Sequence, residues 1–220
     1  MKLKRKFIKT KSPYLAVKTH VNGDFPNDLV ALHNFEGGYC GVSKVENNSI
    51  NLCYITNFKT FKKYKDIEEF QQKVVLKNKY LKVVFSNTAP VFEQPLSISQ
   101  ISFEDKKPIE NHVLMCGDTA ALIHPLCGNG MSMAIRSAQI ASLLIIEFFN
   151  SETPNRETLE KQYLREWNKA FKSRLKIGHV VAALFNQPKI SEVLMQGLKW
   201  FPFILPHIIK RTHGKLMKVK

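Results

Sequence analysis

The residues with the clearest chemical potential lie in one stretch, Val113–Gln139, which reads VLMCGDTAALIHPLCGNGMSMAIRSAQ. It begins with a short apolar run and a single acid, Asp118, and then passes through a Gly-x-Gly (Gly128 and Gly130) into a long apolar helix. A carboxylate that only accepts hydrogen bonds suits the hydroxyl groups of a sugar or sugar alcohol. Two glycines at a helix N-terminus let a flat or anionic ligand approach unpaired backbone N–H groups. An isolated aspartate here would be read more simply as a turn or helix cap.

The spacing within this stretch resembles a flavin motif of FAD-dependent monooxygenases and geranylgeranyl reductases. That family shows G-D-A-A, a spacer, P-x-x-G-x-G and then a helix with A-x-x-S-A. The motif aligns with Gly117, Asp118, Thr119, Ala120, Pro125, Gly128, Asn129, Gly130, Ala134, Ser137 and Ala138, with Thr119 in place of its first alanine and Asn129 at its variable position.

The resemblance implies a role for each of these residues. Gly117 and Asp118 would bring a carboxylate to a ribityl hydroxyl of FAD, and Pro125 would line the isoalloxazine. The helix mouth, comprising Gly128, Asn129, Gly130 and Met131, would direct backbone N–H groups at the pyrimidine edge of the flavin. A helix N-terminus stabilises negative charge there by about 1 kcal/mol.

A second segment fits the reductase branch of the same family. Gly37, Gly38, Tyr39 and Asn51 match its G-G-Y and N-V-G signatures, whereas the branch's tryptophan and Phe-Pro are absent. Tyr39 is therefore a candidate substrate contact, although an aromatic residue in a sheet often belongs to the core. His124, just before Pro125, is a second candidate substrate contact and the nearest candidate acid or base.

The family's dinucleotide fingerprint, G-x-G-x-x-G after a strand, does not occur among the ten glycines of this sequence. We therefore expect the chain to be the C-terminal portion of a larger or split flavoprotein, with a complementary N-terminal half. We also expect the chain by itself to bind FAD weakly or not at all.

The rest of the sequence supplies elements that would position the motif. Alternating apolar residues predict an antiparallel meander of about four strands over 12–21, 29–35, 37–46 and 49–56, with a further strand at 96–103. A helix is predicted over 65–80 and another over 130–150. Residues 113–117 form an apolar run typical of a strand inside a parallel sheet. Beyond a capped start near 153–154, the sequence predicts a long helix or a helix pair.

These elements predict an α/β (α+β) fold. A substrate-domain sheet and helix would occupy 1–104, the C-terminal segment of a Rossmann-like FAD-binding domain 105–150, and a helical C-terminal region 151–220. No internal repeat, zinc-ligand spacing or signal peptide is found, so a metal site is not expected and reduced cysteines in the cytoplasm are expected.

The net charge of +15 is concentrated at the two ends of the chain. Residues 1–20 carry seven Lys/Arg and no acid, and residues 171–220 carry ten and one acid, Glu192. The apolar helix over 130–150 is long enough to span a membrane, but Arg136, Gln139 and Glu147 argue against that. At the C-terminus, basic residues are interleaved with apolar and aromatic ones. This favours an anionic membrane surface over nucleic acid, with solubilising charge or packing of this end on the body as open alternatives.

Two functions are compatible with these observations. The first is an FAD-dependent oxidoreductase that hydroxylates, or reduces a carbon–carbon double bond of, a lipophilic or aromatic substrate, with NAD(P)H as reductant. The second is a non-catalytic, basic, membrane-associated module that retains part of the flavoprotein fold. For neither reaction of the oxidoreductase does the sequence offer a convincing catalytic acid or base; His124 is the nearest candidate.

Overall fold

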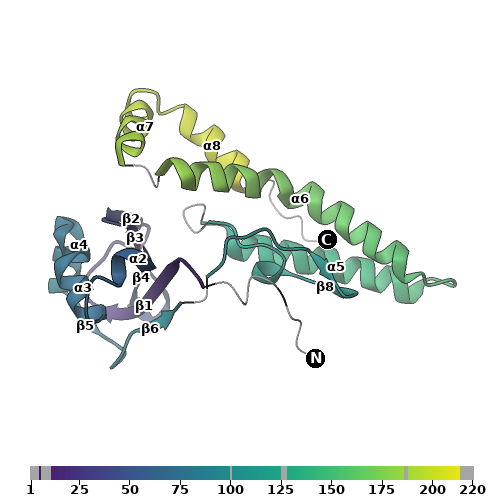
Figure 1. Ribbon diagram of the computed structural model, residues 1–220, viewed down its shortest axis with the longest axis horizontal. Coiled ribbons are helices and arrows are strands. Elements are labelled where there is room, and N and C mark those ends of the chain that lie inside the picture. The colour runs from purple at the N-terminus through teal and green to yellow at the C-terminus, as the bar shows by residue number, and fades with distance from the viewer. Residues whose placement is uncertain (1–4, 6–10, 100, 125–127, 186–187, 214–220) are drawn as a thin grey trace. The chain divides into compact units, whose positions relative to one another are not determined.

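The computed structural model describes residues 5, 11–99, 101–124, 128–185 and 188–213. These residues belong to two compact units, Met1–Ser102 and Phe103–Lys220 (Figure 1).

The first unit is built on an antiparallel sheet whose strands occur in the order β2-β3-β4-β1. The long strands are β1 (Tyr14–Asn22), β2 (Val30–Phe35), β3 (Gly38–Lys44) and β4 (Ile50–Asn57). All four predicted strands are confirmed, but the predicted four-stranded meander is wrong. Only β2, β3 and β4 form a meander, because β1 pairs along its length with β4 and not with β2.

Two short strands complete the sheet on the other edge of β1. They are β5 (Ala89–Pro90) and β6 (Leu96–Ile98). The predicted strand over 96–103 therefore contributes only three residues to the sheet.

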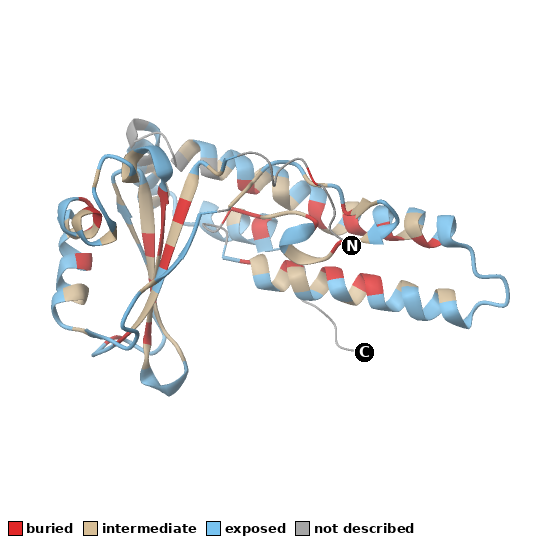
Figure 2. Ribbon diagram, turned by 60° about the horizontal axis from the view of Figure 1, so that its bottom comes forward, coloured by how far each residue is buried: buried red, intermediate tan, exposed pale blue. Residues whose placement is uncertain are grey.

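One face of the sheet is packed with apolar side chains that alternate along each strand, and helices supply the rest of this core. The helices are α2 (Phe58–Phe61), α3 (Ile67–Lys73), η2 (Val75–Lys77) and α4 (Lys79–Ser86). The core contains Leu15, Val17, Val21, Phe25, Cys40, Val42, Ile50, Leu52, Tyr54, Phe70, Val74, Val75 and Leu81. In Figure 2 the buried residues of this unit are concentrated on the long strands. Each fully buried aliphatic side chain stabilises the unit by about 1.5–3 kcal/mol relative to exposure.

The single helix predicted over 65–80 is wrong, because the structure breaks it in two. Val74 leaves the helical region at φ −125° and ψ −59°. Asn78 then caps a new helix, with its side chain accepting hydrogen bonds from the N–H groups of Tyr80 and Leu81. Asparagine favours such capping positions, and this makes a restart possible without any proline or glycine.

The second unit begins with a two-stranded hairpin, β7 (Ile109–Glu110) and β8 (Val113–Leu114), paired antiparallel. Asn111 and His112 form the turn with φ of 50° and 61°, as a tight two-residue hairpin requires. The expectation of a strand in a parallel sheet is therefore wrong within the described residues. Apolar runs of this length do not reveal the direction of pairing.

Four helices follow the hairpin. They are α5 (Gly130–Asn150), α6 (Arg156–Phe185), α7 (Pro188–Trp200) and α8 (Ile204–His213). The boundaries of α5 match the prediction. Helices α5 and α6 lie side by side (Figure 1). Buried residues of α6 recur every fourth position, which places them in one stripe: Leu159, Tyr163, Trp167 and Phe171.

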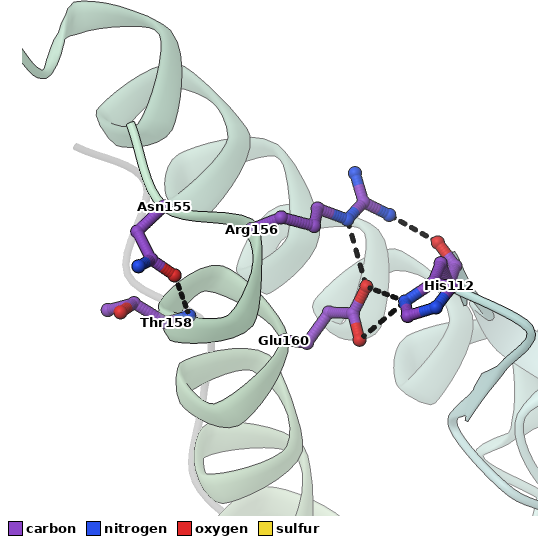
Figure 3. Close-up of polar contacts among 5 residues, drawn as sticks. All are labelled: His112, Asn155, Arg156, Thr158 and Glu160. Carbon is purple, nitrogen blue, oxygen red and sulfur yellow. Dashed lines mark hydrogen bonds and ion pairs between the residues drawn. The ribbon is translucent and has the colours of Figure 1, made fainter. Parts of the chain in front are cut away.

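Polar contacts fix the start of α6 to the hairpin (Figure 3). Asn155 caps the helix, because its side chain accepts a hydrogen bond from the Thr158 N–H at 3.0 Å. Glu160 accepts from Arg156 at 2.9 Å and contacts His112 Nδ1 at 3.1 Å. The Arg156 guanidinium also donates to the His112 carbonyl. Arg156, and more weakly His112, hold the pKa of the Glu160 carboxyl below its usual range.

Helix α5 is long and apolar enough to cross a membrane, and 22% of its most hydrophobic window is buried. It packs on α6 and on the loop before it rather than on a sheet. The large apolar residues that it leaves exposed are Met131, Ile135, Leu143, Ile145, Ile146 and Phe149. The mixed α/β fold class predicted from the sequence is confirmed.

The two glycines of β3 provide a matched test of the sheet. A Cβ at Gly38 would lie 2.2 Å from the Ile55 carbonyl oxygen, whereas a Cβ at Gly41 would meet nothing closer than 3.6 Å. We expect Gly38→Ala to lower the free energy of unfolding by about 2 kcal/mol or more and Gly41→Ala by less than about 1 kcal/mol. Chemical denaturation followed by circular dichroism measures both, and equal effects would contradict the described packing.

Candidate functional site

Helix α6 holds the chain that leads into the Gly-Asp segment. The Tyr163 hydroxyl donates a hydrogen bond to the Met115 carbonyl at 2.5 Å and lies 3.6 Å from the Cys116 sulfur. Burial raises the pKa of the Tyr163 phenol, so it is a protonated donor. The Met115 N–H in turn donates to the Pro108 carbonyl at 2.8 Å. The backbone entering the motif is therefore fixed on both sides.

The two ends of the sequence motif meet at Gly117. Its N–H donates to the Ser137 hydroxyl of α5 at 2.9 Å, and this hydroxyl donates to the Ala134 carbonyl, also at 2.9 Å. Gly117 has φ +58°, and a Cβ there would lie 3.2 Å from the Ala134 Cβ. Glycine, alanine and serine are thus needed together, because they allow the loop to touch the helix.

Asp118 follows in the short helix η3 (Gly117–Thr119) and is exposed. Asp118 lies inside η3 and not at its N-cap, which is Cys116. Within the described part of the chain, its carboxylate has no hydrogen-bond or ion-pair partner. Its main-chain carbonyl accepts a hydrogen bond from Lys106 Nζ at 2.8 Å. The structure therefore rejects the capping role and presents the carboxylate to solvent or to a ligand.

The helix mouth is open. Gly128 has φ +65°, and no atom of the described residues lies within 4 Å of an added Cβ; among the same residues, the nearest atom to an added Cβ at Gly130 is the Ile123 Cγ2 at 4.0 Å. Asn129 is the N-cap residue of α5 but makes no side-chain cap hydrogen bond. The N–H groups of the first turn, which includes Met131, are thus available beside a partial positive charge. Pro125 lies outside the described residues.

Asn129 itself is buried, and its side chain is directed at the C-terminal helix. The amide nitrogen donates to the Thr212 carbonyl of α8. The amide oxygen is buried and has no hydrogen-bond partner among the described residues. Its contribution to a ligand site would come from its backbone and from this unpaired oxygen. The Met131 side chain is 84% exposed.

The two candidate substrate contacts lie in different units. Tyr39 is half-buried in β3, opposite Asn34 and Ile55, on the face of the sheet that does not carry the helix-covered core. His124 is buried and stacks on Phe103 with ring centroids 5.0 Å apart. Burial, and to a lesser extent His179, lowers the pKa of His124 to about 4. His124 is therefore neutral at physiological pH.

The second unit also contains a cavity of about 270 Å³ beside the Gly-Asp loop. Its walls include Lys106, Leu122, Trp167, Lys172 and His179. None of the described residues that were predicted to bind a cofactor lines it.

Sequence reasoning missed two residues that hold the site in place, Tyr163 and Lys106. Tyr163 was detectable in principle, because apolar residues recur every four positions from Leu159 to Phe171 and a tyrosine in such a stripe needs a partner for its hydroxyl. Lys106 carries no such signal, since any flexible lysine in a polar loop would look the same.

The Ser137 contact can be isolated with a serine in the same helix. Both Ser137 and Ser142 donate to the carbonyl three residues earlier, but Ser137 alone of the two also accepts from Gly117 and is buried. We expect Ser137→Ala to cost about 1–2 kcal/mol of stability and Ser142→Ala less than about 0.5 kcal/mol. Thermal or urea unfolding measures the stability of both variants. Unchanged stability in Ser137→Ala would show that the Ser137–Gly117 hydrogen bond does not anchor the loop.

Buried His124 predicts a specific pH dependence. Its pKa is about 4 in the folded chain and about 6.5 when unfolded, so the unfolded state takes up the proton first as pH falls. Stability should decline between about pH 6.5 and 4, by up to about 3 kcal/mol, and level off below. Urea unfolding across this range should show the decline in wild type and in exposed-site control His207→Phe, but not in His124→Phe. A His124→Phe variant that shows the same loss of stability with falling pH as wild type would contradict the assignment of this loss to His124.

No model of a known protein family matches the chain. Two curated proteins are similar in sequence. Conditioned medium factor receptor 1 of Dictyostelium discoideum is 26% identical over 144 residues, which are 61% of this chain and 26% of that protein. An uncharacterized protein of Methanocaldococcus jannaschii is 31% identical over 108 residues, 49% of this chain and 26% of that protein. The chain thus spans about a quarter of the length of each.

Solved structures show the fold. The flavin-dependent brominase Bmp2 superposes with a TM-score of 0.64 at 14% identity, covering 95% of this chain and 52% of the brominase. The myxobacterial FAD-dependent halogenase CndH gives 0.64 at 14% identity, with coverages of 80% and 42%. A variant of Klebsiella pneumoniae HpxO complexed with FAD gives 0.63 at 12% identity, with coverages of 92% and 55%. The fold of the chain is therefore similar to that of about half of each of these flavin-binding proteins.

Proposed function

We propose that this chain forms the ribityl and isoalloxazine half of an FAD site in an FAD-dependent oxidoreductase. The observation that carries the proposal is the Gly117–Ser137 hydrogen bond. It fixes the Gly-Asp loop on α5 while leaving the Asp118 carboxylate exposed and without a partner in the described part of the chain. The fold likeness to FAD-dependent enzymes supports the same cofactor.

The residues present suit this half of the cofactor. Asp118 would accept a hydrogen bond from a ribityl hydroxyl. Gly128 and Gly130 lack the side chains that would keep a flat ring from the first turn of α5. The N–H groups of that turn and the helix dipole would stabilise negative charge at the ring edge by about 1 kcal/mol. When bound, a flavin supplies hydride or oxygen-transfer chemistry, and the protein positions and polarises it.

The remaining proposals concern the ADP half of FAD, the reductant, the substrate and the location. The ADP half of FAD would be held by a dinucleotide-binding part, either elsewhere in the same polypeptide or in a complementary partner. NAD(P)H is the proposed reductant. The substrate is proposed to be lipophilic or aromatic, with Tyr39 and His124 as candidate contacts and a geranylgeranyl reductase-like reaction as one possibility. The proposed location is the cytoplasm or the cytoplasmic side of a membrane.

A half-site makes a prediction that a complete FAD site does not. We expect the chain to bind riboflavin and FAD weakly and with affinities within about tenfold of each other, because it contacts only the part they share. ADP should not compete. Isothermal titration, supported by flavin fluorescence, measures all three ligands. Tight FAD binding that ADP displaces would contradict the half-site.

Asp118 can be tested against a neighbouring acid. Asp118→Asn keeps the shape of the side chain but removes its charge, and should weaken riboflavin binding about tenfold. Asp105→Asn, an exposed acid of the preceding loop, is the matched control and should not change binding. Equal effects of the two variants would remove Asp118 from the proposed site.

The alternative function is a non-catalytic, basic, membrane-associated module that retains part of the flavoprotein fold. The exposed apolar and basic residues of α7 and α8 favour it. The titration separates the two functions, since the module should show no saturable flavin binding at any concentration tested.

A further inference from the structure

The last two helices of the described chain expose an unusual number of large apolar side chains. Val193 and Trp200 of α7 are 73% and 71% exposed, and Phe203 in the connecting turn is 65% exposed. We call the following set the C-terminal apolar surface: Val193, Trp200, Phe201, Phe203, Leu205 and Ile209. A soluble protein rarely leaves aromatic and aliphatic side chains clustered in this way without a partner.

Local structure explains why these side chains point outward. Val193 and Trp200 are seven residues apart and therefore share a face of α7. Phe201 and Phe203 flank Pro202 in the turn, with ring centroids 6.0 Å apart. The turn is ordered by hydrogen bonds from Phe201 N to the Gly197 carbonyl and from Ile204 N to the Phe201 carbonyl, at 2.8 and 3.1 Å.

Helix α7 uses a different side to pack on α6, whereas in α8 the exposed Leu205 and the buried Thr212 are seven residues apart and share a face. Leu194, Leu198 and Ile208 are half-buried, and Thr212 is buried. Both α7 and α8 contact α6. On α7, the C-terminal apolar surface is therefore the side left exposed after the helix has packed on α6.

The basic residues of α7 and α8 indicate which kind of partner the C-terminal apolar surface binds. Lys199 of α7 and Lys210 and Arg211 of α8 are exposed beside the apolar residues. Across residues 171–220 there are ten Lys/Arg and one acid. Aromatic rings with a basic surround suit the interface of an anionic bilayer, where rings sit at the headgroup level and lysine and arginine contact phosphates. We propose that the C-terminal apolar surface docks peripherally on an anionic phospholipid membrane.

Other occupants fit the observations less well. An apolar protein interface does not require charge of one sign, and the cores of such interfaces are depleted of charged residues. Duplex nucleic acid would use the basic residues but offers nothing to the aliphatic side chains. Insertion of α5 would expose the Arg136–Gln139 pair, joined at 2.6 Å, to lipid and would disturb the Ser137 contact with Gly117. Each alternative is an outcome of the tests below.

The first test is flotation of the full chain with lipid vesicles. Vesicles of phosphatidylcholine mixed with phosphatidylglycerol should carry the protein upward, whereas pure phosphatidylcholine vesicles or high salt should reduce the partition coefficient about tenfold or more. Equal binding to both vesicle types, or no binding, would overturn the proposal. Binding to duplex DNA or to RNA that is tighter than binding to anionic vesicles would also overturn it.

Paired variants locate the contact. The triple change Trp200→Ala, Phe201→Ala and Phe203→Ala should lower vesicle binding about tenfold or more. The control Ile135→Ala, Ile146→Ala and Phe149→Ala removes exposed apolar groups from α5 and should leave it unchanged. Lys210→Glu with Arg211→Glu should weaken binding to anionic vesicles, whereas Lys62→Glu with Lys63→Glu, on exposed lysines of the first unit, changes net charge equally and should not. Loss of binding in the controls alone would overturn the assignment.

A spectroscopic measurement needs no destabilising change. The chain has two tryptophans, Trp167, which is buried at 5% exposure, and Trp200, which is exposed. Anionic vesicles should shift the emission of Trp200 to shorter wavelength, and lipids brominated near the headgroup should quench it. Trp200→Phe should abolish the shift while the protein still floats. A shift that persists in Trp200→Phe would place the contact elsewhere. The inference is independent of the flavin site, so either can fail alone.

Discussion

The candidate site depends on one hydrogen bond, from the N–H of Gly117 to the hydroxyl of Ser137. It joins a loop and a helix twenty residues apart at a distance that only small residues permit. A larger residue at Ala134, or any side chain at Gly117 in its left-handed conformation, would force the loop away from α5. The contact at Gly117 therefore fixes the backbone from which the exposed Asp118 side chain projects.

The support for this contact comes from the long helix α6 rather than from a sheet. Its buried stripe packs the second unit together, and Tyr163 in the stripe holds the carbonyl of Met115, just ahead of the Gly-Asp loop. A site built on two packed helices needs few polar groups of its own. This accounts for a candidate site in which the carboxylate and the helix mouth are presented outward while their neighbours are buried.

The parts that the sequence predicted well are those governed by local rules. Alternation located the four long strands, and an apolar run with a Gly-x-Gly start located α5 to the residue. Pairing was not predictable in the same way, because whether β1 joins β2 or β4 depends on long-range packing. The break at Val74 reflects a competition between continuing the helix and capping a new one with Asn78. No single residue in the sequence predicts which of the two prevails. The sequence motif includes Gly117, Ala134 and Ser137, but only the three-dimensional structure shows that these residues are in contact.

The hydrogen bond from Asn129 to Thr212 joins the N-cap of α5 to the last turn of α8. Asn129 is buried while α8 is in place, so displacing α8 would break this hydrogen bond at the N-cap of α5. The helix mouth and the C-terminal helix are therefore energetically coupled through this hydrogen bond. Suppose that a partner binds α8 and changes the affinity for a ligand at the mouth of α5 by some factor. Thermodynamic reciprocity then requires that the ligand change the affinity for the partner by the same factor.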